Sequence, residues 1–134
     1  MTSKEYLEQI KNLDRLIQAN QEQLQSVRAQ ATKITSSLSE KVSGSKNDKM
    51  STLVCKIVEL EDTISESLTR LYDMKQDAFE KINTLSNNNE KATLIYKYIE
   101  CLSLYEISKK THMSEATVKR TIKNALGHLK IDTH

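Results

Sequence analysis

Apolar residues recur at alternating steps of four and three over the first third of the chain, a pattern typical of a coiled-coil helix. Thr2 and Glu5 stand at the spacing of a capping box, in which each side chain accepts a hydrogen bond from the other residue's backbone amide. These features predict a helix from about residue 3 to the mid-30s. The heptad positions are Tyr6, Ile10, Leu13, Ile17, Asn20, Leu24, Val27, Ala31, Ile34 and Leu38.

The heptad pattern stops at residues 36–49, where serine, glycine, lysine and asparagine follow one another without a repeating apolar position. We interpret this stretch as a connector. A second long helix should follow it and end near residues 86–89, where Asn87 and its two neighbouring asparagines supply a linker and the next helix cap. Its apolar face contains Met50, Leu53, Ile57, Leu60, Ile64, Leu68, Leu71, Ala78, Ile82 and Leu85.

Two long amphipathic helices joined by a connector predict an antiparallel hairpin, closed within one chain or by exchange of helices between two chains. The polar Asn20 either meets a polar group on a facing helix, which would set the register, or lies at a wet edge. The predicted oligomerisation seam consists of Ile10, Leu13, Ile17, Asn20, Leu24, Val27, Ile57, Leu60, Ile64 and Leu71.

A two-helix hairpin has little interior, so further apolar residues should remain partly exposed. A homodimer would cover these side chains, whereas isolated apolar residues on a protein surface are the alternative explanation. The residues concerned are Leu7, Leu16, Val54, Val58, Tyr72 and Phe79.

Three shorter helical patterns end the chain. Residues 90–102 direct Leu94, Ile95, Tyr98, Ile99 and Leu102 toward a core. A helix at about 104–111 should begin at the capping box of Ser103 and Glu106, with Ile107 as its core residue. The third, over 114–130, has Ser114 as its N-cap and an inner face of Val118, Ile122, Ala125 and Leu129.

The last two of these helices meet at a tight turn, so the pattern predicts a helix-turn-helix. The fold class is therefore all-α. We expect a hairpin and oligomerisation region over residues 1–86, with its connector at about 36–49, and a three-helix helix-turn-helix domain over 90–134. The chain of 134 residues contains no proline and only two glycines, which agrees with long helices.

Basic charge is concentrated in the predicted helix-turn-helix domain. Residues 1–89 hold 12 basic and 13 acidic side chains, whereas residues 90–134 hold 8 basic and 5 acidic ones. The net charges of these two parts are therefore −1 and +3. This distribution favours double-stranded DNA as a partner, and an ordinary solvated helix surface is the alternative.

The 114–130 helix carries the candidate DNA contacts, because the N-terminal residues on the outer face of a helix in the major groove lie closest to base edges. Arg120 suits guanine and Glu115 suits the cytosine amino group. The base-facing candidates are Glu115, Ala116, Lys119 and Arg120, with Lys119 a base or a phosphate contact. The phosphate candidates are Ser114, Thr117, Lys109, Lys110 and Lys123.

Catalytic and metal-binding patterns are missing from the sequence. Cys55 and Cys101 form no C-x-x-C pair, and the three histidines lie near no paired carboxylate or nucleophile motif. We expect no enzyme activity, no metal and no cofactor. The chain also has no long apolar run and no signal peptide, so we expect a cytoplasmic protein without a membrane partner.

The Ser103–Leu129 segment resembles the last helix-turn-helix of bacterial sigma factors, which reads promoter DNA. The matching residues are Leu102, Ser103, Glu106, Ile107, Ser114, Thr117, Val118, Lys119, Ala125 and Leu126. Cys101 and His112 depart from the pattern, because such modules usually have glycine before the first helix and often in the turn. Histidine tolerates a left-handed backbone there at some cost.

The chain as a whole is similar to a phage-encoded family grouped with late transcription regulators of the ArpU and RinA type, through TSKEYLEQIKNLD, SGSKNDKM, VCKIVELE and YIECLSLYEIS. The resemblance implies a phage transcription regulator that reads promoter or operator DNA and recruits RNA polymerase, and the uncovered apolar residues of the hairpin indicate that it acts as a dimer. One alternative is a DNA-packaging factor of the small-terminase kind, for which a ring of eight or more subunits is expected. Another is a module that binds RNA polymerase or a regulator without DNA.

Overall fold

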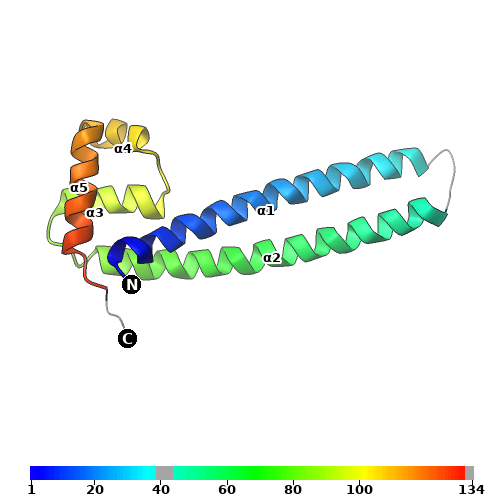
Figure 1. Cartoon of the computed structure of the whole chain (residues 1–134), viewed down its shortest axis with the longest axis horizontal. Coiled ribbons are helices and arrows are strands. Elements are labelled where there is room, and N and C mark those ends of the chain that lie inside the picture. The colour runs from blue at the N-terminus through cyan, green and yellow to red at the C-terminus, as the bar shows by residue number, and fades with distance from the viewer. Residues whose placement is uncertain (39–43, 132–134) are drawn as a thin grey trace. The chain divides into compact units, whose positions relative to one another are not determined.

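The computed structural model describes residues 1–38 and 44–131 (Figure 1). The helices of this part are α1 Ser3–Leu38, α2 Gly44–Ile82, α3 Asn88–Leu94, the π-helical turn η1 Ile95–Ile99, α4 Leu104–Thr111 and α5 Glu115–His128. No strand occurs over these two described ranges. The all-α prediction is confirmed, including the long hairpin and the C-terminal helix-turn-helix.

Helices α1 and α2 run antiparallel (Figure 1). The Tyr6 hydroxyl donates a hydrogen bond to Asp77, and Arg28 Nη2 lies 2.7 Å from Glu61 Oε1. The partner number on α2 falls as the number on α1 rises, which is the signature of antiparallel helices. The two helices of the chain therefore form an antiparallel hairpin; whether copies exchange helices stays open.

The predicted cap of α1 is confirmed. The Glu5 amide donates to Thr2 Oγ1 at 3.1 Å, and the Thr2 amide donates to Glu5 Oε2 at 3.2 Å. These two bonds satisfy amides that have no partner inside the first helical turn. The helix therefore begins where the sequence indicates.

The connector predicted at about 36–49 is too long at both ends. Helix α1 continues to Leu38 and α2 already begins at Gly44, while residues 39–43 lie outside the described residues. The C-terminal end of α2 was also predicted too late, because the helix ends at Ile82 and not near residues 86–89. Serine, glycine and asparagine weaken a helix but can still occupy its end turns when the backbone there forms helical hydrogen bonds. A boundary inferred from composition can therefore differ from the true one by a few residues.

The chain divides into two compact units, Met1–Asp14 with Leu71–His134, and Arg15–Arg70. In the Arg15–Arg70 unit, the seam residues Ile17, Leu24, Val27, Ala31 and Ile64 are buried. Ile57 and Leu60 are half-buried, as is Asn20, which keeps contact with solvent at the edge of the seam. The Arg28–Glu61 ion pair is about half exposed and contributes little to stability.

In the other unit, the first turns of α1 pack with the C-terminal helices. Ser3 Oγ donates a hydrogen bond of 2.6 Å to the carbonyl oxygen of Leu126 in α5. The Tyr98 ring is buried, and its hydroxyl is hydrogen-bonded to Glu8 of α1. Burial, with a smaller effect of the Glu8 carboxylate, raises the pKa of Tyr98 to about 12. The start of α1 is thus part of the core that supports α5.

Most of the predicted seam is buried, but the exposure of two leucines differs from the prediction. Leu7 was expected to stay partly exposed, yet its exposed fraction is 0%; it stands about 90° around α1 from the hairpin seam, in the unit that also contains the C-terminal helices. Leu68 was expected on the apolar face but is 45% exposed. In the seven-residue repeat from Ile64 to Leu71, the half-buried Ser67 takes the seam position between them, and Leu68 stands about 50° to the other side of the seam's centre line.

The other apolar residues outside the seam are exposed, as predicted. Leu16, Val54, Val58, Tyr72 and Phe79 each have at least 42% of their surface accessible. The functional boundary expected between residues 86 and 90 stays a prediction, as does the role of the seam in oligomerisation.

The different burial of Leu7 and Leu16 makes a matched stability test. We expect Leu7→Ala to lower the free energy of unfolding by about 2–5 kcal/mol, because it leaves a cavity in a closed core. Leu16→Ala removes the same atoms from the same helix at a site that is 54% exposed. It should change stability by less than about 1 kcal/mol. Urea unfolding followed by circular dichroism measures both, and equal losses would contradict the packing of α1 on the C-terminal helices.

Candidate nucleic-acid interface

Helix α3 and the turn η1 pack against the helix-turn-helix, because α3 contacts α5 and η1 contacts α4. Asn87 caps α3 by accepting hydrogen bonds from the amides of Asn89 and Glu90, as predicted. The helical stretch begins at Asn88 and ends at Ile99, so the predicted helix at 90–102 is displaced toward the N-terminus. It closes as a π turn, in which the Glu100 amide donates to the carbonyl oxygen of Ile95 at 2.9 Å.

Helix α4 has the predicted bounds and the predicted cap. The Glu106 amide donates to Ser103 Oγ at 3.2 Å, and the Ser103 amide donates to Glu106 Oε1 at 3.4 Å. Ile107 is completely buried beneath it. The capping box therefore sets the start of the helix, and the buried Ile107 sets its orientation.

Helix α5 packs against α3 and α4 through one apolar face. Ser114 is its N-cap, accepting a hydrogen bond of 3.1 Å from the Thr117 amide. The Ser114 hydroxyl also donates to Thr117 Oγ1 at 2.8 Å, so these two phosphate candidates are held together. The inner face predicted from the sequence is confirmed, because Val118, Ile122, Ala125 and Leu129 are all buried.

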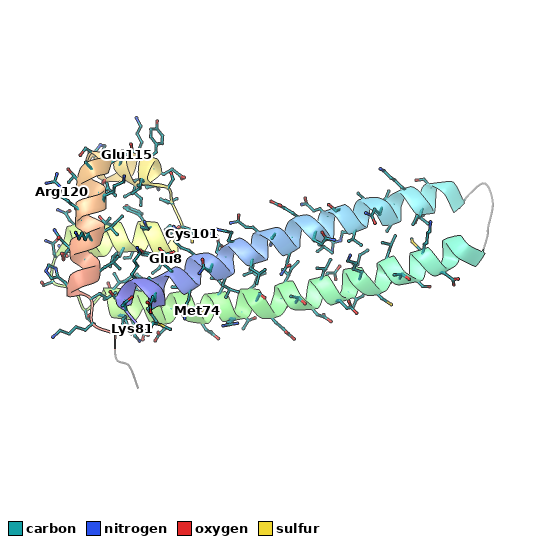
Figure 2. The ribbon with its side chains drawn as sticks, viewed as in Figure 1. Glu8, Met74, Lys81, Cys101, Glu115 and Arg120 are labelled. Carbon is teal, nitrogen blue, oxygen red and sulfur yellow. The ribbon has the colours of Figure 1, made fainter. Side chains whose placement is uncertain are left out.

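The outer face of α5 is open to solvent. Figure 2 shows Glu115 at the start of the helix and Arg120 farther along it. The predicted base-facing residues Glu115, Ala116, Lys119 and Arg120 are all exposed, as is Lys123. On α4, the ammonium groups of Lys109 and Lys110 lie 5.3 Å and 5.6 Å from the ring centres of Tyr105 and Tyr96. The structure brings the lysines of α5 and Arg120 together on one helix; their contacts with DNA remain a prediction.

Two residues adopt the left-handed backbone that the sequence indicated. Cys101 has φ 56° and His112 has φ 58°, and over residues 1–38 and 44–131 no other non-glycine residue has a positive φ. They stand where comparable modules have glycine, just before and just after α4. Burial, assisted by the Asp14 carboxylate, raises the pKa of the Cys101 thiol, so this cysteine stays protonated.

Several supporting contacts were not predicted. Ser108 Oγ donates a hydrogen bond of 2.6 Å to the carbonyl oxygen of Met113, which ties the turn to α4. Glu90 is buried and its carboxylate lies 2.7 Å from His128 Nδ1, joining the start of α3 to the end of α5. The Asn87-x-x-Glu90 spacing is typical of a helix start, but nothing in it indicates a partner 38 residues away.

No helix in the described part of the chain combines the length and apolar character that a membrane span requires. The described histidine, cysteine and acidic residues form no group of three that could hold a metal ion.

Residues 83–129 match the protein family described as Sigma-70, region 4. The matched segment contains α3, η1, α4 and α5, and therefore the complete helix-turn-helix. Region 4 of sigma-70 is a DNA-binding helix-turn-helix domain, which agrees with the resemblance found in the sequence. No curated protein and no solved structure matches the chain. The similarity to ArpU-type and RinA-type regulators remains an expectation.

The left-handed turn residue His112 provides a stability test. Glycine adopts this conformation without the steric cost that a side chain brings, so we expect His112→Gly to stabilise the protein by about 0.5–1 kcal/mol. The same replacement inside a helix, Lys123→Gly, should destabilise it by about 0.5–1 kcal/mol. Thermal unfolding of the two variants checks the opposite signs, and destabilisation by both would contradict the turn geometry.

Proposed function

We propose that this protein is a DNA-binding transcription regulator that inserts α5 into the major groove of promoter or operator DNA. The premise is the sigma-70 region 4 match of its C-terminal segment. The observation that carries the proposal is the division of α5 into a buried apolar face and an exposed face that contains Arg120 and two lysines. A helix has the dimensions to enter the major groove, and this exposed face would meet the DNA.

The side chains of the exposed face suit distinct parts of the duplex. Arg120 can donate two hydrogen bonds to guanine, Glu115 can accept one from the cytosine amino group, and Ala116 leaves room for a thymine methyl group. Lys119 contacts a base or a phosphate. The remaining candidates hold the sugar-phosphate backbone and set affinity rather than sequence preference: Ser114, Thr117, Lys109, Lys110 and Lys123.

The proposed setting follows from the resemblance. A sigma-70 region 4 domain implies contact with RNA polymerase as well as with DNA, so we propose polymerase as a second partner. The overall similarity to phage late regulators supports a phage-encoded protein that acts in the cytoplasm of the host cell. No catalytic step is part of this function.

We also propose that the protein works as a homodimer, through an exposed apolar stripe on α2. In the Arg15–Arg70 unit, Val54, Val58 and Leu68 are 48%, 51% and 45% exposed. At 100° per residue these three side chains lie within about one quarter of the helix circumference, beside the hairpin seam. Covering this stripe with a second copy removes apolar surface from water and spaces two helix-turn-helix domains for paired half-sites.

The DNA proposal is tested with the double variant Lys119→Ala, Arg120→Ala. The probe is a duplex obtained by binding selection from the encoding genome, and binding is measured by fluorescence anisotropy. We expect at least about a tenfold loss of affinity, because one good base contact is worth about 1–3 kcal/mol. The affinity of the unchanged protein should fall with salt at a log-log slope of about −0.9 per phosphate contact.

The matched control is Lys33→Ala, Arg70→Ala, which removes the same two kinds of charge from exposed positions of the hairpin. It should bind the duplex nearly as well as the unchanged protein. Equal losses in both variants would reject the proposed face of α5. An unchanged protein that binds no duplex would favour the module that engages proteins only.

The dimer proposal is tested with Val54→Glu, Val58→Glu. Charges placed on the stripe should convert a dimer to a monomer in sedimentation equilibrium, with helicity preserved by circular dichroism. The control variant Thr52→Glu, Thr63→Glu adds the same charge at exposed positions on the opposite side of α2 and should remain dimeric. A monomeric unchanged protein, or a ring of eight or more subunits, would overturn the proposal.

A further inference from the structure

A cleft of about 530 Å³ lies beside α5, in the unit formed by residues 1–14 and 71–134. Four lysines from three separate elements line it: Lys4 of α1, Lys97 of η1, and Lys119 and Lys123 of α5. Among the described residues that line it there is no aspartate or glutamate. The cleft is therefore a concentrated basic site, built by segments that lie up to 119 residues apart.

Three apolar or aromatic side chains with little exposure also line the cleft. Tyr98 and Ile122 are buried there, and Leu126 is half-buried. The position of a side chain at Gly127 has no atom within 4 Å, so the cleft is open to solvent at this end. An open, shallow site with charged walls suits an extended ligand that passes through it.

Hydrogen bonds on both sides of Lys4 hold the start of α1 against this site. Ser3 is bonded to the Leu126 carbonyl oxygen, and Glu8, which Figure 2 labels on α1, is bonded to the hydroxyl of Tyr98. The position of Lys4 beside α5 is thus a consequence of the fold. It does not depend on the lysine side chain itself.

Positive charge prevails around Lys97, although the Glu8 carboxylate acts on it. Burial lowers the pKa of Lys97, and the positive charges of Lys11 and Lys4 lower it further, while Glu8 opposes them. Like charges held close together cost free energy. A bound polyanion lowers this cost, and its binding also releases counterions.

We propose that this cleft binds the phosphate backbone of the same duplex whose major groove receives α5. The inference rests on the proposed function and extends it, because it makes Lys4, outside the matched segment 83–129, a DNA-contact residue. A helix in the major groove lies between two sugar-phosphate strands. One of these strands runs along the flank of α5 on which Lys119 and Lys123 stand.

Helix geometry also assigns a role to Lys119. Relative to the buried Val118, Lys119 is turned by 100° and Arg120 by 200°, so Arg120 points outward while Lys119 stands on the flank. Lys119 lines the cleft together with Lys97. Within this proposal Lys119 contacts phosphate and Arg120 reads bases.

An acidic protein segment would also be attracted by four lysines. DNA is favoured because Lys123 belongs both to the cleft and to the exposed face that carries Arg120. A duplex seated on that face brings a backbone to the cleft without any further rearrangement.

The test is the double variant Lys4→Gln, Lys97→Gln, with a fluorescein-labelled duplex of arbitrary sequence as the probe, since phosphate contacts carry no sequence information. Affinity is measured over a range of salt concentrations. Removal of two phosphate contacts should reduce the magnitude of the log-log salt slope by about 1.8. At 0.1 M salt the affinity should fall on the order of tenfold or more.

Two controls separate charge from structure. Lys33→Gln, Lys56→Gln removes the same charge from exposed hairpin positions and should keep the slope of the unchanged protein. Lys4→Arg, Lys97→Arg retains both charges and should also keep it. In addition, the duplex should protect Lys4 and Lys97, but not Lys56, from acetylation in the unchanged protein, as read by mass spectrometry.

The failures of the two proposals are distinguishable. If the unchanged protein binds duplex through Arg120 but Lys4→Gln, Lys97→Gln has the slope of its control, the cleft proposal alone is overturned. Loss of polyglutamate binding in this variant, with an unchanged DNA slope, would assign the cleft to an acidic protein partner and overturn it as well. Absence of duplex binding by the unchanged protein would overturn both proposals.

Discussion

Burial of the inner face of α5 is the constraint on which the rest of the structure depends. Val118, Ile122 and Ala125 are buried where α5 packs against α3 and α4, and this fixes the rotation of α5 about its own axis. Because successive residues differ by 100°, the same rotation turns Arg120 outward and brings Lys119 to the flank. The chemistry offered to DNA is thus set by packing on the opposite side of the helix.

A short three-helix module has little apolar surface to bury, and this chain enlarges its core with the start of α1. Leu7 and Ile10 are fully buried in the unit that contains α5, and polar bonds from Ser3 and Glu8 join α1 to α5 and Tyr98. The start of the hairpin therefore belongs to the core of this unit. Its first turns stabilise the helix-turn-helix and place a fourth lysine at the cleft beside α5.

Local signals predicted much of the fold because their partners are close in sequence. Both capping boxes join residues three apart, and the heptad and inner-face spacings follow from the geometry of one helix. Cys101 and His112 were recognisable through the resemblance, because they stand where similar modules have glycine, and both have a positive φ. Boundaries were predicted less well: the connector was drawn too long, α2 ends earlier than its apolar pattern, and η1 ends the bracing helix at Ile99.

By itself, the sequence determined the helical class, the two long amphipathic helices, the helix caps, the turn and the outer face of α5, because each depends on a spacing that repeats within one or two helical turns. Only the tertiary structure decided the burial of Leu7, the pairing of Glu90 with His128 and the position of Lys4 beside Lys97. These features join residues that are distant along the chain, and the periodicity of a single helix does not indicate such contacts. The free energy of packing several helices into one core selects it, so it appears only when the whole chain is folded.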